Sequence, residues 1–113
     1  MQEPWSEVTG WLLNHVDHTV VIRKEEDGDT DRVKMKLHQV TYRPEISDGN
    51  DYIDAARLVL HGDGVIATEN GTGAAELPLG KYEIPLGRTS QGSTKDGALL
   101  IHTERATYQV SSI

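Results

Sequence analysis

The 113-residue sequence contains no cysteine and no phenylalanine. Without cysteine the chain has no disulfide, no thiol nucleophile and no thiolate ligand for a metal. Without phenylalanine, the core must be built from aliphatic side chains, two tryptophans and four tyrosines. Leu, Ile and Val total 26 residues, so we expect a lean core, part of which a second subunit completes.

Positive charge is also scarce, and long apolar runs are absent. The chain carries 18 Asp and Glu against 11 Lys and Arg, and its pI is near 5.1. This balance argues against a globally basic nucleic-acid binder and against a protein that binds anionic membranes. No stretch approaches the roughly 18 apolar residues of a transmembrane helix. The N-terminus lacks the pattern of a signal peptide, so we expect an acidic, soluble, cytoplasmic protein.

Strand-forming residues and turn signals dominate the rest of the sequence. Val, Ile and Thr number 26, against 17 for Leu plus Ala, which favours strands over helices. Asp-Gly and Asn-Gly pairs recur along the chain and mark turns. We expect an all-β fold with one antiparallel domain over residues 1–113, a small barrel-like or two-layer sandwich of about eight strands.

The N-terminal segment has two interpretations. Apolar residues between Trp5 and Leu12 recur at helical spacing after Pro4, a residue that suits the first turn of a helix. Gly10 lies inside the segment and weakens a helix. The pattern predicts a short N-terminal helix or, alternatively, a strand over Val8–Asn14. In either case we expect the two tryptophans to pack in the core.

The clearest predicted element is a β-hairpin with its turn at Asp27-Gly28. This turn places Ile22 opposite Val33 and Lys24 opposite Asp31, all on the face that carries the apolar side chains. A shift of one residue would separate these partners, so the sequence specifies the register.

The next strands are predicted from the alternation of apolar residues and from glycines. The apolar residues lie at odd positions from Val33 to Leu37 and at even positions from Val40 on, which predicts a β-bulge near His38-Gln39. Glycines at both ends of residues 62–64 suggest a three-residue turn that folds residues 57–61 against residues 65–69.

The C-terminal third is expected to hold a short strand, a loop and a hairpin. Tyr82–Leu86 is a short strand candidate whose proline favours a sheet edge. Residues 87–97 are polar and glycine-rich, and we interpret them as a flexible loop. A turn at residues 104–105 would place Ile101 opposite Tyr108.

A small cluster of possible metal ligands follows the N-terminal segment. His15, Asp17 and His18 lie within four residues, and imidazole with carboxylate suits zinc, iron or manganese. A turn before the strand that begins at Thr19 explains these residue types equally well. The alternative functional hypothesis is therefore a metal-dependent enzyme that uses this cluster together with a distant histidine.

No sequence motif supports nucleophilic or cofactor-dependent catalysis. The serines lie outside any G-x-S-x-G context. The two short G-x-G segments neither open a helix in a βαβ unit nor precede the Lys-Ser or Lys-Thr of a P-loop. We name no catalytic residues and expect no cofactor.

One local group of cations departs from the acidic average. It lies on the polar side of the first hairpin, between residues 23 and 36, and suggests weak binding of single-stranded nucleic acid as a further alternative. A solvated, salt-bridged sheet face accounts for the same residues and makes nucleic acid the less favoured partner. The group consists of Arg23, Arg32, Lys34 and Lys36.

We therefore expect a non-enzymatic β domain that binds a small ligand or a partner protein and associates with itself, as a homodimer. A ligand would bind in the mouth of the barrel, with residues 87–97 as a lid. Aromatic side chains are the candidate ligand contacts: Trp11, Tyr42, Tyr82 and Tyr108.

Overall fold

The computed structural model describes residues 5–44, 46–47, 53–54, 56–68, 74–86 and 90–113. One helix, α1 (Ser6–Leu13), precedes the sheet. The main sheet contains β1 (Thr19–Glu26), β2 (Asp29–Arg43), β5 (Ala56–Thr68), β6 (Ala74–Glu76), β7 (Lys81–Leu86), β8 (Gln91–Lys95), β9 (Ala98–His102) and β10 (Thr107–Ser112). The remaining elements are β3 (Ile46–Ser47), β4 (Ile53–Asp54) and the short 3-10 helix η1 (Pro78–Gly80).

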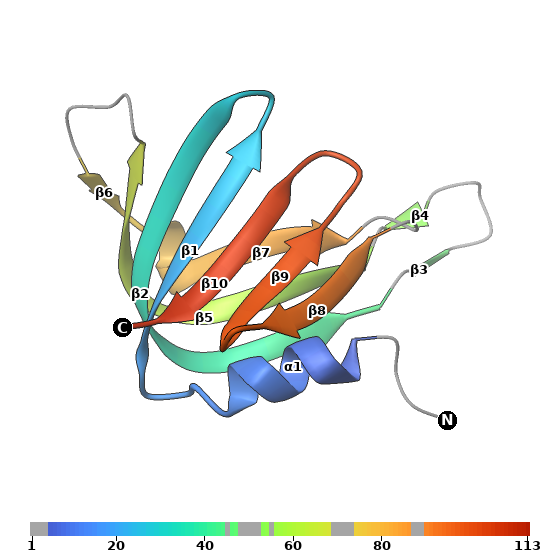
Figure 1. The fold of residues 1–113 in the computed structure, drawn as a ribbon, viewed down its shortest axis with the longest axis horizontal. Coiled ribbons are helices and arrows are strands. Elements are labelled where there is room, and N and C mark those ends of the chain that lie inside the picture. Colours follow the sequence, from blue (N-terminus) through green and yellow to red (C-terminus); the bar gives the residue numbers. More distant parts are fainter. Residues whose placement is uncertain (1–4, 45, 48–52, 55, 69–73, 87–89) are drawn as a thin grey trace.

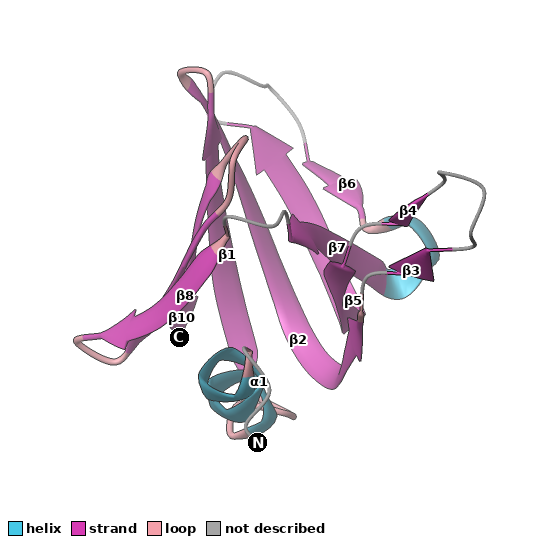
Figure 2. Cartoon of the chain, turned by 90° about the vertical axis from the view of Figure 1, so that its right-hand side faces the viewer, coloured by secondary structure: helices cyan, strands magenta, loops and turns pink. Residues whose placement is uncertain are grey.

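The eight-stranded sheet is antiparallel and bends back on itself. Its order is β6-β5-β2-β1-β10-β9-β8, and β7 also pairs with β5. β1, β10, β9 and β8 form one layer, β5 and β7 form the other, and β2 connects them (Figures 1 and 2). Within the described residues the two outer edges do not pair, so the sheet stays open. The expected all-β, two-layer, barrel-like fold is confirmed.

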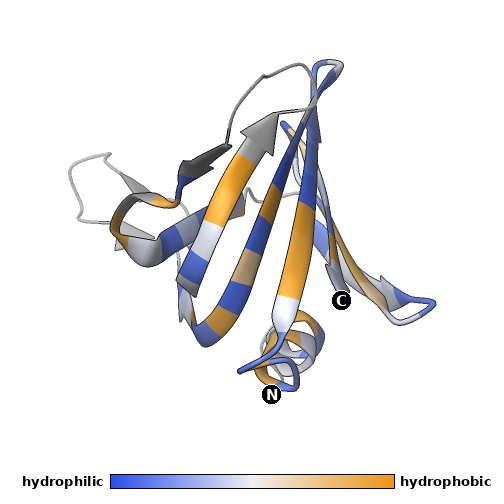
Figure 3. Ribbon diagram, turned by 90° about the vertical axis from the view of Figure 1, so that its left-hand side faces the viewer, coloured by the Kyte–Doolittle hydropathy of each residue, from blue (hydrophilic) through white to orange (hydrophobic). Residues whose placement is uncertain are grey.

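The first hairpin has the predicted register. Ile22 pairs with Val33 and Lys24 pairs with Asp31. Asp27 and Gly28 both have positive φ (51° and 85°), the conformation that two-residue hairpin turns require. Hydrophobic and hydrophilic residues alternate in bands along the long strands (Figure 3), because successive side chains point to opposite faces.

The predicted bulge and the bend of β2 coincide. The pairing of β2 with β5 shifts register between Leu37 and Gln39, at the position where the apolar parity changes. A bulge bends a strand, and this one lets β2 run from one layer into the other.

The predicted turn over residues 62–64 is wrong. β5 continues straight through this segment and pairs with β2, Gly62 with Leu37 and Gly64 with Met35. A Cβ at Gly64 would lie 2.6 Å from the carbonyl oxygen of Lys34, and a Cβ at Gly62 would overlap that of Lys36. The glycines therefore allow two strands to approach closely. Glycine is also typical of turns, so the sequence alone does not distinguish the two roles.

The last hairpin is confirmed, whereas the loop before it is partly wrong. Ile101 pairs with Tyr108, as expected. Residues 91–95 of the expected loop form β8, which pairs with β9. Residues 87–89, the other part that could act as a lid, lie outside the described residues.

Of the two predicted alternatives for the N-terminal segment, a helix and a strand, the structure has the helix. This helix covers one end of the space between the layers. Val8 and Leu12 are buried, and Trp5 is 8% exposed. A Cβ at Gly92 of β8 would collide with the side chains of Val8 and Trp5, so the helix lies directly on that strand. Buried side chains of α1 and of both layers form one hydrophobic cluster that fills the interior.

Candidate ligand-binding site

At the end of the molecule opposite α1, the inward face of the sheet changes from aliphatic to polar and aromatic. Ile22 pairs with Val33 and Val110, and all three are buried. Two residues further along β1, Lys24 pairs with Asp31 on β2 and with Tyr108 on β10. The side-chain alternation of strands keeps this row on the same face, so charge and a phenol border the apolar interior.

A cavity of about 400 Å³ opens beside this row, and we call it the mouth pocket. Its volume lies within the range of small-molecule sites. Four parts of the chain supply its walls: the end of β1, the end of β7, the turn between β9 and β10, and the start of β10. The lining residues are Lys24, Glu26, Pro85, Leu86, Thr103, Glu104, Arg105 and Tyr108.

Lys24 is held above Tyr108. Its ammonium lies 5.9 Å from the centre of the Tyr108 ring and 3.4 Å from the Glu26 carboxylate. The first distance is within the range of a cation–π interaction. The side chain remains 30% exposed, so its charge is available to a ligand in the pocket.

A second phenol lies near the first. Burial raises the pKa of Tyr82, and the neighbouring Tyr108 and Asp31 raise it further. Burial also raises the pKa of Tyr108, although Lys24 opposes this effect. Both phenols therefore stay neutral at physiological pH, where a hydroxyl can donate and accept hydrogen bonds. Within the described part of the chain neither hydroxyl is a buried group without a partner, so water or a ligand can form hydrogen bonds with it.

The structure places the four predicted aromatic residues in different surroundings. Tyr82 and Tyr108 come together, and Tyr108 lines the mouth pocket. Tyr42 is half-buried on β2 and packs against the core. Trp11 lies on α1, where its ring stacks on His15 and its indole N–H donates to the carbonyl oxygen of Gly97 at 3.2 Å.

The predicted metal cluster forms the connection between α1 and β1. The Nδ1 of His15 donates to the carbonyl oxygen of Trp11 at 2.7 Å, and the ring centres of His15 and His18 are 5.7 Å apart. Asp17 has φ of 72°, and its backbone N–H donates to Leu37. Among the described residues no group of three or more His, Asp or Glu side chains is arranged to hold a metal ion. The turn explanation accounts for all three residues.

Sequence reasoning did not assign Lys24 and Arg105 to a site. Lys24 could have been predicted as a site residue, because the alternation of β1 places this charged side chain on the apolar face of the first hairpin. Arg105 had no such signal, since the turn that carries it reaches the pocket only through the bend of the sheet.

In the described part of the chain, no helix is long and apolar enough to cross a membrane. The comparison with solved structures gave no match. A Bacillus subtilis (strain 168) protein named "Uncharacterized protein YmzB" is 32% identical over 111 residues, which cover 93% of this chain and 92% of that protein. The family profile described as YmzB-like protein matches residues 1–113. The chain therefore belongs to the YmzB-like protein family.

Proposed function

We propose that this chain is a non-enzymatic binding protein that holds a small amphipathic ligand in the mouth pocket. The observation that carries the proposal is the Tyr108 ring, which lines the pocket below the Lys24 ammonium and has a second neutral phenol, that of Tyr82, near it. Polar groups that converge beside an apolar cavity are typical of ligand sites.

The walls of the pocket suggest which part of a ligand goes where. Pro85, Leu86 and the Tyr108 ring provide an apolar surface on which an aromatic or aliphatic group can pack. Lys24 and Arg105 provide positive charge at the rim, where a carboxylate or sulfonate would form charge-assisted hydrogen bonds.

The same lining supports binding rather than catalysis. Thr103 provides a hydroxyl that lines the pocket, and that hydroxyl already donates to the carbonyl oxygen of Ala106 and accepts from its N–H. A nucleophile needs a neighbouring base and a free lone pair. The Thr103 hydroxyl is instead occupied by backbone hydrogen bonds of its own turn.

Titration of the whole chain with anilinonaphthalene sulfonate tests the proposal, since this probe joins an aromatic surface to an anion. We expect a saturable rise in fluorescence. Lys24→Met should weaken binding roughly fivefold, which corresponds to about 1 kcal/mol. Lys34→Met on the outer face is the matched control and should leave the affinity unchanged.

Two results would contradict the proposal. One is a fluorescence signal that never saturates, because it would mean non-specific adsorption. The other is equal weakening by Lys24→Met and Lys34→Met, because it would mean that only overall charge matters. Equal urea midpoints for the two variants would exclude loss of folding as the cause of a difference.

A further inference from the structure

The outer face of the β1–β2 hairpin carries two regions of opposite charge. At the turn, Glu25 on the outer face and Asp27 in the turn itself carry negative charge, whereas Glu26 and Asp29 are cross-strand partners on the inward face. We call residues 25–29 the acidic tip. A hollow of about 380 Å³ lies here, and Glu25, Thr30 and Thr107 line it from the outer face. The tip extends beyond the rest of the sheet (Figure 1).

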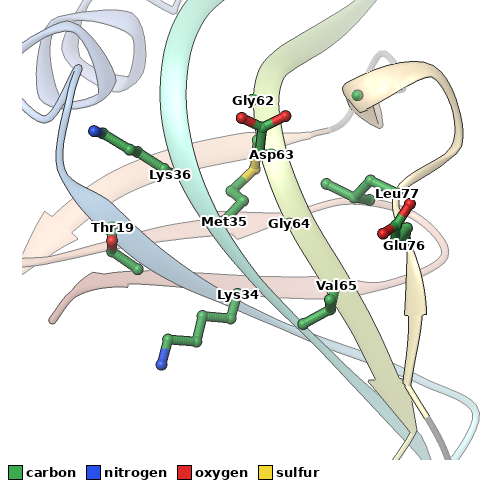
Figure 4. A pocket seen from close by; sticks show the side chains of 11 residues that line it. Thr19, Lys34, Met35, Lys36, Gly62, Asp63, Gly64, Val65, Glu76 and Leu77 are labelled. Atoms are coloured by element: carbon green, nitrogen blue, oxygen red, sulfur yellow. The ribbon is translucent and has the colours of Figure 1, made fainter.

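The opposite end of the same face carries a trough of about 690 Å³, which we call the lysine trough (Figure 4). Lys34 and Lys36 project from β2 on one side, and Asp63 and Glu76 lie on the other. Gly62 and Gly64 of β5 line the trough with backbone alone, because atoms of β2 occupy the position that a Cβ would take at each of them. The lining residues are Thr19, Lys34, Met35, Lys36, Gly62, Asp63, Gly64, Val65, Glu76, Leu77 and Gly80.

The two lysines of the trough make no ion pair with a described residue. Lys36 is the direct cross-strand partner of Asp63, a position from which opposite charges usually interact. Both lysines instead extend away from β5 (Figure 4), and Asp63 lies 3.4 Å from His38. Two cations therefore remain available to a partner.

We propose that this face binds a second copy of the chain, with the acidic tip of each copy in the lysine trough of the other. The two-fold axis lies between the two outer faces and perpendicular to the strands, at the level between Thr30 and Arg32. It sets the two hairpins face to face with their strands running in opposite directions. Side chains of one face recur every second residue, so Lys34 then lies over the other copy's tip. Arg23 and Glu25, which form an ion pair at 2.9 Å within each chain, then lie over the same pair of the other copy. Two-fold symmetry makes each contact twice.

Two observations favour a second copy over a nucleic acid strand. Asp63 and Glu76 form one wall of the trough and would repel a continuous row of phosphates. The described tryptophans and tyrosines belong to the core or pack against it, so this face offers no ring for base stacking. The acidic tip carries its charge at one point and avoids the acidic wall.

Surface charge pairs contribute little individually, about 0–1 kcal/mol each. We therefore expect a reversible dimer. Salt should weaken it, because dissolved ions screen exposed charges and the screening length is only about 10 Å at moderate ionic strength. The mouth pocket opens on the inward face and stays accessible in such a dimer.

Sedimentation equilibrium of the full chain from about 10 µM to about 1 mM tests the dimer. We expect the apparent mass to rise from 12.5 kDa toward twice that value, and to fall again in high salt. Lys34→Glu with Lys36→Glu should weaken dimerisation at least tenfold, and so should Glu25→Lys with Asp27→Lys. Lys81→Glu on β7 is the control and should have no effect.

Mixing the two double variants is the decisive measurement, because their charges are again complementary. We expect a heterodimer from the mixture when neither variant alone forms a dimer. A chain that stays at 12.5 kDa at all concentrations, or a dimer that survives both double variants, overturns the proposal. Binding of labelled oligothymidine that Lys34→Glu with Lys36→Glu abolishes, in a chain that stays monomeric, also overturns it in favour of nucleic acid.

Discussion

At Gly62 the missing side chain lets β5 lie directly against β2. A Cβ there would overlap the carbonyl oxygen of Lys36 and lie 2.9 Å from the Met35 methyl group. We predict that Gly62→Ala lowers the free energy of unfolding by about 1–3 kcal/mol, because the strands must separate to admit the methyl group. Urea denaturation measures the change.

Gly10 is the matched control at the same scale. It lies in α1, and a Cβ there would have no neighbour within 4 Å. Gly10→Ala should raise the free energy of unfolding by about 0.5–1 kcal/mol, because alanine favours the helix. Similar effects of the two substitutions would contradict the close approach of β5 and β2.

Tyr82 makes a second residue-scale prediction, which concerns pH. Its pKa in the folded chain lies above its ordinary value of 10.0, chiefly through burial and also through Tyr108 and Asp31. The unfolded chain therefore loses this proton first as pH rises. The stability that the neutral phenol contributes is fully present below pH 10 and is lost progressively above it.

We expect Tyr82→Phe to reduce the loss of stability in alkaline solution. Urea midpoints between about pH 8 and about pH 11 provide the measurement. At the lower pH the two proteins should differ little in their pH dependence. If the variant loses stability above pH 10 as steeply as the parent chain, the burial of this phenol does not govern its ionisation.

At the scale of elements, α1 depends on one buried stripe. Leu12 is fully buried whereas its neighbour Leu13 is 59% exposed. We predict that Leu12→Ala costs about 2–5 kcal/mol, the cost of emptying a packed site. Leu13→Ala should change stability by less than about 0.5 kcal/mol. Equal costs, measured from urea denaturation midpoints, would mean that the helix does not cover the end of the core.

Local patterns predicted some elements well and others poorly, for physical reasons. The hairpin at Asp27-Gly28 was predictable because its turn residues and its alternation agree. β8 was missed because Gln91–Lys95 is polar throughout and gains its order from pairing with β9 and from α1. The glycines of β5 led to the wrong prediction of a turn, because glycine is favoured both in turns and where two strands approach closely.

At the scale of the whole molecule, the bend of the sheet creates the candidate site. Lys24, Leu86 and Arg105 come from segments far apart in the sequence and meet only because the two layers face each other. Alternation predicts which face a residue lies on, but it contains no information about which layer lies opposite. The fold class could therefore be derived from the sequence, whereas the membership of the pocket could not.

The shared core makes a last prediction about cooperativity. Side chains of α1 and of both layers belong to one hydrophobic cluster, so neither layer nor the helix can open without exposing the others. We expect a single two-state transition in urea. Trp5 and Trp11 both lie at α1 and report on that end through their fluorescence, while far-ultraviolet circular dichroism reports on the strands. The two curves should coincide. A fluorescence change that precedes the loss of strand signal would mean that α1 leaves the sheet first and that the core is not one cooperative unit.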